Sequence, residues 1–425
     1  MLSTLVNLAG GQVLRLVSNL ILTRLLFPEA FGLMALVNLF LMGLAMFSDI
    51  GIGPGIVQKR GALSAAFLQT AWTVQVLRAV GLFVITCAVA WPLSAFYEQP
   101  ELILILPAAG LTQLISGFKS VALHTYSREL RHATLAIYDL TTGFVGLISS
   151  ILIAMCCPSV WALVIGGMIS AVYAVIFSFK LPDQAACGFR LDRGYVGELL
   201  RFGGWIFLGT TLTFFAGSGD RLMLGRFLSL QELGVYTVAF FFAQTVSSLV
   251  RGLASRVLFP VLAKLRVEGE GRLAEYMRYR QILLVGTVVG VGVLMTGSGW
   301  LIDLLYDDRY RSASGMLRVL SLGAAGASFV GLADPVLLAN GNSKGRMWLS
   351  FFEALFLLLC MACGGMWWGL HGYIWGFVCA QFLSCVPAVL LTRPYRVASP
   401  WSDVSFFGAV GGVWILSHLV NPCGF

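Results

Sequence analysis

Polar side chains recur at three-to-four-residue spacing inside long apolar segments of this sequence. Three such stripes comprise Gln12, Arg15, Asn19 and Thr23; Thr210, Thr213, Gly217, Asp220 and Arg221; and Gln244, Ser247, Ser248 and Arg251. This spacing places the members of each stripe on one face of a helix. Because ionisable groups are costly in hydrocarbon, the stripes predict a water-filled cavity lined by the helices that carry them.

The cations in these segments are mostly arginines, which favours an anionic ligand. A guanidinium stays charged at physiological pH and binds phosphate or carboxylate through two parallel hydrogen bonds. We expect an anionic ligand with phosphate or carboxylate groups to contact Arg15, Asn19, Arg24, Arg78, Arg221, Gln244 and Arg251. For any one arginine the alternative is a helix-packing cation, satisfied by backbone carbonyls or by Asp49, Asp139 or Asp220.

Four acidic residues in apolar segments are candidates for pairing between two halves of the protein or for ion coupling. They are Asp49, Asp220, Asp334 and Glu353. Asp334 precedes Pro335, so its alternative role is to satisfy a broken helix. The four histidines lack metal-ligand spacing and no Ser/His/Asp arrangement is visible, so we expect no metal, no cofactor and no catalytic residue.

The composition predicts an all-α integral membrane protein. Of the 425 residues 58% are hydrophobic and 11% charged, whereas a soluble domain averages about 25% charged residues. A membrane span needs about 20 mostly apolar residues. About thirteen such spans are expected, at 5–26, 33–57, 68–95, 102–122, 135–156, 159–180, 203–227, 234–258, 281–303, 314–339, 347–367, 372–391 and 404–420.

The basic residues predict the orientation of the chain. The net charge is +8, but Lys and Arg lie in separate connections and form no continuous basic face, which argues against nucleic acid as a partner. Most of them follow every second predicted span, whereas the opposite connections hold only Arg24, Arg226, Arg309 and Arg311. This bias predicts a cytoplasmic N-terminus and, after thirteen spans, an outside C-terminus.

A weak internal repeat predicts two six-helix halves. Residues from Arg24 align with residues from Arg226, and the same offset places Asp49 opposite Arg251. Asp49 and Arg251 are therefore candidates for an ion pair between the halves, with local partners as the alternative. The expected parts are an N-terminal lobe at 1–181, a cytoplasmic linker at 182–201, a C-terminal lobe at 202–392 and an additional C-terminal span in 393–425.

The start of the chain resembles a known family of membrane transporters. The carrying segments are LTRLLFPEAFGLMAL and FSDIGIGPGIVQKR, supported by RFGGWIFLGTTLTF and DRLMLGRFLSLQELGVY in the second half. They are similar to the polysaccharide-biosynthesis (Wzx-like) flippases of the MOP superfamily. That family usually has fourteen or twelve helices, so the predicted thirteen departs from its pattern and puts the outside C-terminus in doubt.

The resemblance implies a MATE-like fold of two six-helix lobes in the bacterial cytoplasmic membrane. It also implies that undecaprenyl-diphosphate-linked oligosaccharide moves from the inner to the outer leaflet by alternating access, for exopolysaccharide, O-antigen or capsule. Polymerase and export proteins are further candidate partners. The family's cationic cavity corresponds by location alone to Arg15, Arg78, Arg221 and Arg251, and we expect the first, second, seventh and eighth spans to line it.

Three alternatives stay open. A lipid II flippase or a multidrug antiporter of the same superfamily is the nearest, although few carboxylates in the first half count against a cation-coupled drug antiporter. A glycosyl polymerase or ligase would need a sizeable outer loop with catalytic residues, whereas the outer connections are short, the richest being 303–311. A membrane scaffold would not account for the polar stripes.

Overall fold

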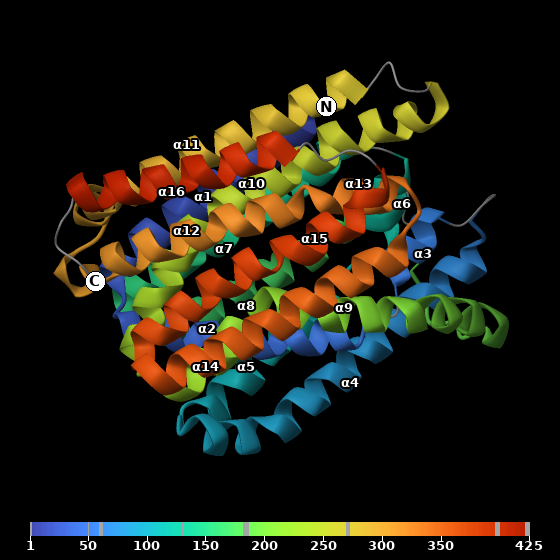
Figure 1. Ribbon diagram of the computed structural model, residues 1–425. Helices are drawn as coiled ribbons and strands as arrows, with labels where there is room; N and C mark the ends of the chain where they lie inside the picture. The colour runs from blue at the N-terminus through green and yellow to red at the C-terminus, as the bar shows by residue number, and fades with distance from the viewer. Residues whose placement is uncertain are drawn as a thin grey trace. The chain divides into compact units, whose positions relative to one another are not determined.

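The fold is helical throughout the part of the chain that the structure describes. This computed structural model describes residues 2–49, 51–58, 63–129, 131–181, 187–268, 273–395 and 400–420. Within these ranges every regular element is an α-helix or a short 3₁₀-helix (Figure 1). In hydrocarbon a helix satisfies its own backbone hydrogen bonds, so an apolar sequence of this kind folds into helices.

Two compact units divide the chain, Met1–Thr211 and Leu212–Phe425. The helices of the first are α1 (Leu2–Leu25), α2 (Pro28–Phe47), α3 (Ile52–Gln58), α4 (Ala65–Tyr97), α5 (Leu102–Gly117), α6 (Ala122–Arg128), α7 (His132–Cys156) and α8 (Val160–Phe179). Helix α9 (Arg193–Phe227) crosses the boundary. The elements of the second are α10 (Leu230–Glu268), α11 (Leu273–Leu305), η2 (Asp308–Tyr310), α12 (Ala313–Gly331), α13 (Ala333–Ala339), α14 (Ser343–Leu383), α15 (Cys385–Thr392), η3 (Arg393–Tyr395) and α16 (Pro400–Val420).

Small residues bring the helices of the first unit into close contact. Helix α4 packs on α5, and α7 packs on both α1 and α8. A methyl group on Gly166 of α8 would lie 2.0 Å from the Ser150 hydroxyl oxygen of α7, and one on Gly117 of α5 would lie 2.1 Å from the Ala79 methyl of α4. Such small-residue contacts supply much of the helix association in membranes, because lipid tails are as apolar as leucine.

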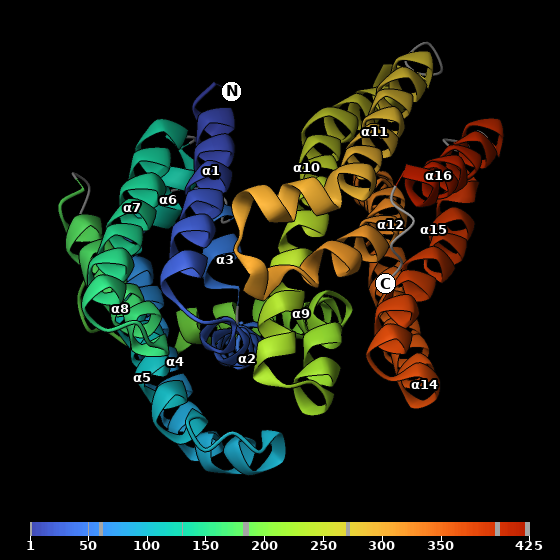
Figure 2. The ribbon, with the colours of Figure 1, turned by 90° about the vertical axis from the view of Figure 1, so that its left-hand side faces the viewer.

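Helix α12 forms the centre of the second unit. It packs against α10, α11 and α14, and Figure 2 shows it among these helices. Every residue from Met316 to Gly331 except Leu322 is buried, and its Gly, Ala and Ser residues leave room for the neighbouring helices. Met295, Leu258 and Phe329 belong to the apolar core around it. Helices α11 and α16 also lie side by side.

Four predicted spans are interrupted, and in one of them, 372–391, α14 ends at Leu383 and α15 begins at Cys385. The range 33–57 contains α2 and α3, separated by Ser48 to Gly51, where Gly51 has a positive φ of 66°. The range 102–122 ends as α5 at Gly117, and α6 follows at a bend of 63°. The range 314–339 contains α12 and α13, which meet at Leu332. In the last case Asp334 and Pro335 lie in the first turn of the new helix, where proline needs no backbone donor.

Helix α14 folds back on itself between two of the predicted spans. Its backbone leaves the helical conformation at Trp368 and Gly369, where Gly369 has φ 58°. A methyl group on Gly364 would lie 2.1 Å from the carbonyl oxygen of Gly372, and one on Gly376 would lie 2.4 Å from that of Cys360. The two halves of α14 therefore contact each other through glycines. This turn agrees with the prediction of two separate spans at 347–367 and 372–391.

The chain is a multi-pass integral membrane protein. In the described part, eight helical segments are long and apolar enough to cross a membrane, or nine if α5 and α6 together form one span. That number treats 343–395, which includes the break in α14, as one segment. Large apolar side chains such as Trp91, Val285 and Met366 are more than 60% exposed, which suits lipid as the surrounding medium. The thirteen predicted ranges all contain helix, while their number as spans stays a prediction.

Candidate functional site

Arg251 of α10 lies at the centre of a polar cluster in the second unit. Its Nη2 atom donates to Gln244 Oε1 at 3.4 Å and to Ser247 Oγ at 3.3 Å, both on the same helix face. The aliphatic part of Arg251 crosses Gly331 of α12, where a methyl group would lie 2.3 Å from Arg251 Cγ. Three members of the predicted stripe, Gln244, Ser247 and Arg251, therefore form a contiguous hydrogen-bonded surface, whereas Ser248 is exposed and donates to the backbone carbonyl of Thr245.

A second arginine, Arg346 of α14, holds two carboxylates. Its Nε atom is 2.7 Å from Asp334 Oδ1 of α13, and its Nη1 atom is 3.3 Å from Glu353 Oε2. The same Nη1 donates to Ser350 Oγ at 2.8 Å. Residues 346, 350 and 353 follow the four-then-three spacing of one helix face, so the helix itself aligns them.

Four charged side chains of this unit influence one another electrostatically, and we call them the four-charge network: Arg251, Asp334, Arg346 and Glu353. Besides their contacts with Arg346, Asp334 and Glu353 both interact electrostatically with Arg251. Two positive and two negative side chains from α10, α13 and α14 thus balance one another in an apolar surrounding. The side chains of Arg346, Asp334 and Glu353 are 25%, 24% and 18% exposed, so the network is open on one side.

Asp220 and Arg221, at the α9 end of the second unit, have separate partners. Asp220 is 1% exposed, and its Oδ2 accepts a hydrogen bond of 2.7 Å from the hydroxyl of Tyr236 on α10. Among the residues that the structure describes, its Oδ1 has no hydrogen-bond partner. The Arg221 guanidinium lies 4.8 Å from the centre of the Phe240 ring, a cation–π distance. Asp220 and Arg221 are adjacent in the sequence, but they contact different side chains, Tyr236 and Phe240.

Arg78 of α4, in the first unit, binds the end of α2. Its Nη2 donates to the carbonyl oxygen of Ala45 at 2.5 Å, and its Nε donates to Ser48 Oγ at 3.0 Å. Asp49 interacts with it electrostatically and accepts a hydrogen bond of 2.9 Å from the backbone of Gly51. A cation at the C-terminus of a helix satisfies unpaired carbonyls. These are the contacts of a helix-packing cation, and a role for Arg78 toward a ligand stays a prediction.

The predicted residues of α1 lie on two sides of that helix, because Arg15 and Asn19 share one side while Arg24, nine residues after Arg15, lies on the opposite side. Arg15 and Arg24 are exposed, and Asn19 between them is half-buried. The hydroxyl of Thr23 donates to the backbone carbonyl of Asn19 at 2.7 Å, which holds the stripe in helical form. Their part in ligand binding, like the proposed pairing of Asp49 with Arg251, stays a prediction.

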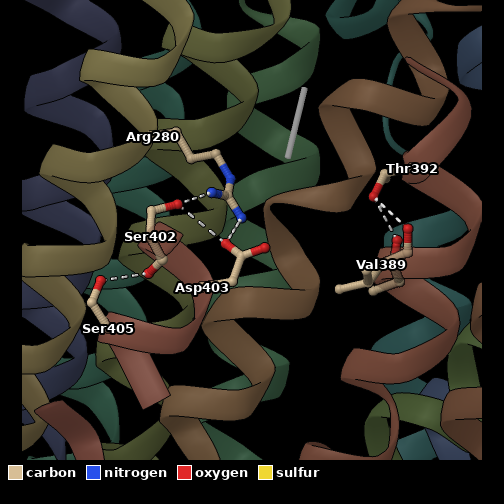
Figure 3. Close-up of polar contacts among 7 residues, drawn as sticks. Arg280, Val389, Thr392, Ser402, Asp403 and Ser405 are labelled. Carbon is tan, nitrogen blue, oxygen red and sulfur yellow. Dashed lines mark hydrogen bonds and ion pairs between the residues drawn. The ribbon is translucent and has the colours of Figure 1, made fainter. Parts of the chain in front are cut away.

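A different kind of ion pair joins α11 to α16. Arg280 Nη2 lies 2.6 Å from Asp403 Oδ1, and Nη1 donates to Ser402 Oγ at 3.0 Å (Figure 3). The guanidinium is also 5.7 Å from the centre of the Phe329 ring. The Arg280 and Asp403 side chains are only 7% and 13% exposed. The pair is largely buried and joins the additional C-terminal helix to the core.

Sequence reasoning missed Arg346 and the Arg280–Asp403 pair, because it placed all three residues outside the predicted spans. For Arg346 a signal was available, since Arg346, Ser350 and Glu353 have the spacing of one helix face. Asp403 lies one residue before the predicted span 404–420, and α16 begins earlier, at Pro400. If each predicted span had been extended by a few residues into its polar flanks, these side chains would have been placed on helices.

Comparison with known protein families shows to which family the chain belongs. The sequence profile of the family described as "Polysaccharide biosynthesis protein" matches residues 21–315. The chain belongs to this family. It is 22% identical over 422 residues to the lipopolysaccharide biosynthesis protein WzxC of Escherichia coli K12, covering 96% of this chain and 82% of that protein. It is 23% identical to the succinoglycan biosynthesis transport protein ExoT of Rhizobium meliloti, covering 84% and 72%.

Solved structures share the fold. The lipid II flippase MurJ in an inward closed conformation has a TM-score of 0.71 and 15% sequence identity, covering 100% of this chain and 93% of that one. An inward-facing multidrug resistance MATE transporter of the MOP superfamily gives the same TM-score and identity, covering 91% and 94%. The polysaccharide-biosynthesis protein described here therefore has the MATE-like fold that its sequence resemblance implied.

Proposed function

We propose that this protein is a flippase that moves undecaprenyl-diphosphate-linked oligosaccharide from the inner to the outer leaflet of the bacterial cytoplasmic membrane. The product would serve the synthesis of a surface polysaccharide. The observation that carries the proposal is the pair of arginines, Arg251 and Arg346, on membrane helices of a member of the polysaccharide-biosynthesis family. The printed names of WzxC and ExoT, one in lipopolysaccharide and one in succinoglycan biosynthesis, support the same substrate class.

The physical problem that such a protein solves is the charge of its cargo. Moving one unpaired ion into hydrocarbon costs at least several kcal/mol, and a lipid diphosphate carries two negative charges. A guanidinium offers five N–H donors and matches a phosphate with two of them. In the proposal Arg251 and Arg346 bind the diphosphate, while the polyprenyl tail stays in lipid.

Further residues have assigned roles in the proposal. Arg15, Arg24, Arg78 and Arg221 provide additional positive charge along the path, and Asn19 and Gln244 donate and accept hydrogen bonds to sugar hydroxyls. Asp49 and Asp220 serve in pairing or ion coupling. The proposal includes alternating access by two six-helix lobes, thirteen spans, a cytoplasmic N-terminus and contact with polymerase or export proteins.

Complementation tests this function directly. Cells of several species, each lacking its own polysaccharide flippase, would receive the intact chain, Arg251→Gln or the matched control Arg311→Gln at equal membrane levels. Arg311 is an exposed cation of the second unit outside the four-charge network. We expect surface polysaccharide from the intact chain and Arg311→Gln, and at least about tenfold less from Arg251→Gln. Failure of the intact chain in every host, despite normal insertion, would contradict the proposal.

A further inference from the structure

The four-charge network has a property that simple anion sites lack, because its arginines already have anions. Arg346 contacts Asp334 and Glu353, and both carboxylates also interact with Arg251. A site preformed for a phosphate would leave its arginines with neutral partners only. Here Ser350, Ser247 and Gln244 are the neutral partners, and the carboxylates add two negative charges.

We propose that Asp334 and Glu353 are internal counter-ions that bind Arg346, close to Arg251, in the unloaded protein and are displaced by the diphosphate of the cargo. This inference rests on the proposed function. The carboxylates stand where phosphate oxygens would bind: one at 2.7 Å from Nε of Arg346 and the other at 3.3 Å from its Nη1. A guanidinium donates hydrogen bonds to carboxylate and phosphate oxygens in the same planar geometry. Glu353 accepts one such bond from Arg346, whereas the contact with Asp334 is an ion pair.

The unloaded and the loaded site hold the same number of negative charges. A diphosphate esterified at both ends carries two negative charges, the same number as the two carboxylates. The arginines are therefore neutralised with or without cargo, and neither state leaves them as uncompensated cations in the membrane. The neutral partners Ser247, Gln244 and Ser350 can keep their bonds during the exchange, because they bind the arginines directly.

Exposure distinguishes this network from a structural ion pair. Exchange requires that a ligand reach the arginine, and Arg346, Asp334 and Glu353 are 25%, 24% and 18% exposed. The Arg280–Asp403 pair of the same unit is 7% and 13% exposed and has α11, α12 and α16 around it. Asp334 also lies in a helix of seven residues that starts at the break after α12, so its backbone is not part of a long rigid helix.

The counter-ion role makes a prediction that a structural role does not make. Neutralising either carboxylate removes a competitor of the diphosphate, so the affinity for diphosphate must increase. A residue that only supports the fold or positions the arginines would give weaker binding when changed. Arg346→Gln must weaken binding in either case.

The experiment uses the full chain in lipid nanodiscs. The probe is farnesyl diphosphate whose second phosphate is esterified with one sugar, called farnesyl diphosphate below, and the corresponding sugar ester of farnesyl monophosphate serves for comparison. We expect Glu353→Gln and Asp334→Asn each to bind the diphosphate about tenfold more tightly than the unchanged protein. Asp403→Asn is the matched control, because it makes the same chemical change at the closed ion pair, and its affinity should be unchanged. Thermal unfolding of each sample checks that the variants are folded.

Two results would overturn the inference, and they differ from each other. If the unchanged protein binds farnesyl diphosphate but both carboxylate variants bind it equally or more weakly, the counter-ion role is wrong and the proposed function stands. If the unchanged protein binds neither probe, diphosphate recognition itself fails and the proposed function falls with it. Should Glu353→Gln not fold, Asp334→Asn tests the same prediction at the other carboxylate and must bind the diphosphate more tightly.

Discussion

Two ion-pair sites in the second unit differ in exposure and in stoichiometry. At the α11–α16 contact, Arg280 and Asp403 form a one-to-one pair that is largely buried. In the four-charge network, Arg346 binds two carboxylates, Arg251 influences both electrostatically, and the side chains are about one-fifth to one-quarter exposed. Closed pairs hold helices together, whereas open groups with exchangeable partners are able to bind ligands. The same residue types thus serve structure at one place and, in our proposal, transport at the other.

The largest expected effect breaks the closed pair. Asp403→Ala leaves the Arg280 guanidinium buried without its carboxylate, and we expect a loss of about 3 to 5 kcal/mol in the free energy of unfolding. Chemical or thermal unfolding in nanodiscs measures this loss. A double variant, Arg280→Met with Asp403→Leu, removes both charges and should recover most of the stability. If Asp403→Ala is as stable as the unchanged protein, the pair does not hold α16 to the core.

A smaller effect is expected at Tyr236, whose hydroxyl binds the buried carboxylate of Asp220. Tyr236→Phe removes that hydrogen bond, and we expect a loss of about 1 to 3 kcal/mol because a buried acceptor loses its partner. The same unfolding measurement applies, with Tyr279→Phe as a matched control on the half-buried part of α11. Unchanged stability would show that the hydrogen bond between Tyr236 and Asp220 does not hold α9 to α10.

The smallest expected effect is at Gly331, which contacts Arg251 of the four-charge network. A methyl group on Gly331 would lie 2.3 Å from Arg251 Cγ, so Gly331→Ala must move the flexible arginine side chain. We expect farnesyl diphosphate to bind a few times more weakly, by about 0.5 to 1 kcal/mol, with little change in stability. Gly297→Ala on α11 meets no atom within 4 Å and is the matched control. Equal binding by both variants would show that the position of Arg251 over Gly331 does not matter.

The sequence was sufficient for the helices because span formation depends on local apolar length. All thirteen predicted ranges contain helix, and the break between 347–367 and 372–391 corresponds to the turn of α14 at Trp368 and Gly369. The breaks at Gly51 and Leu332 were missed. They interrupt apolar runs without lowering their hydrophobicity, so a measure of apolar length does not detect them.

The site was predictable only in part, because side-chain partners depend on packing between distant helices. The stripe Gln244, Ser247 and Arg251 follows from helical spacing alone and is observed. The meeting of Asp334 with Arg346 depends on how α13 and α14 pack, which one sequence does not reveal. Arg346 was assigned to a connection because it lies one residue before the apolar run 347–367. The positive charge next to a span was interpreted as a topology signal and proved to belong to a helix.

The most direct test of the central claim is translocation by the purified protein in liposomes. One oligosaccharide would be attached to a polyprenyl diphosphate and, in parallel, to the corresponding monophosphate, and its appearance in the opposite leaflet would be measured with a lectin. We predict that the unchanged protein translocates the diphosphate lipid at least about tenfold faster than Arg251→Gln/Arg346→Gln does, and prefers it to the monophosphate. Equal translocation by the double variant would contradict the claim that these two arginines carry the diphosphate.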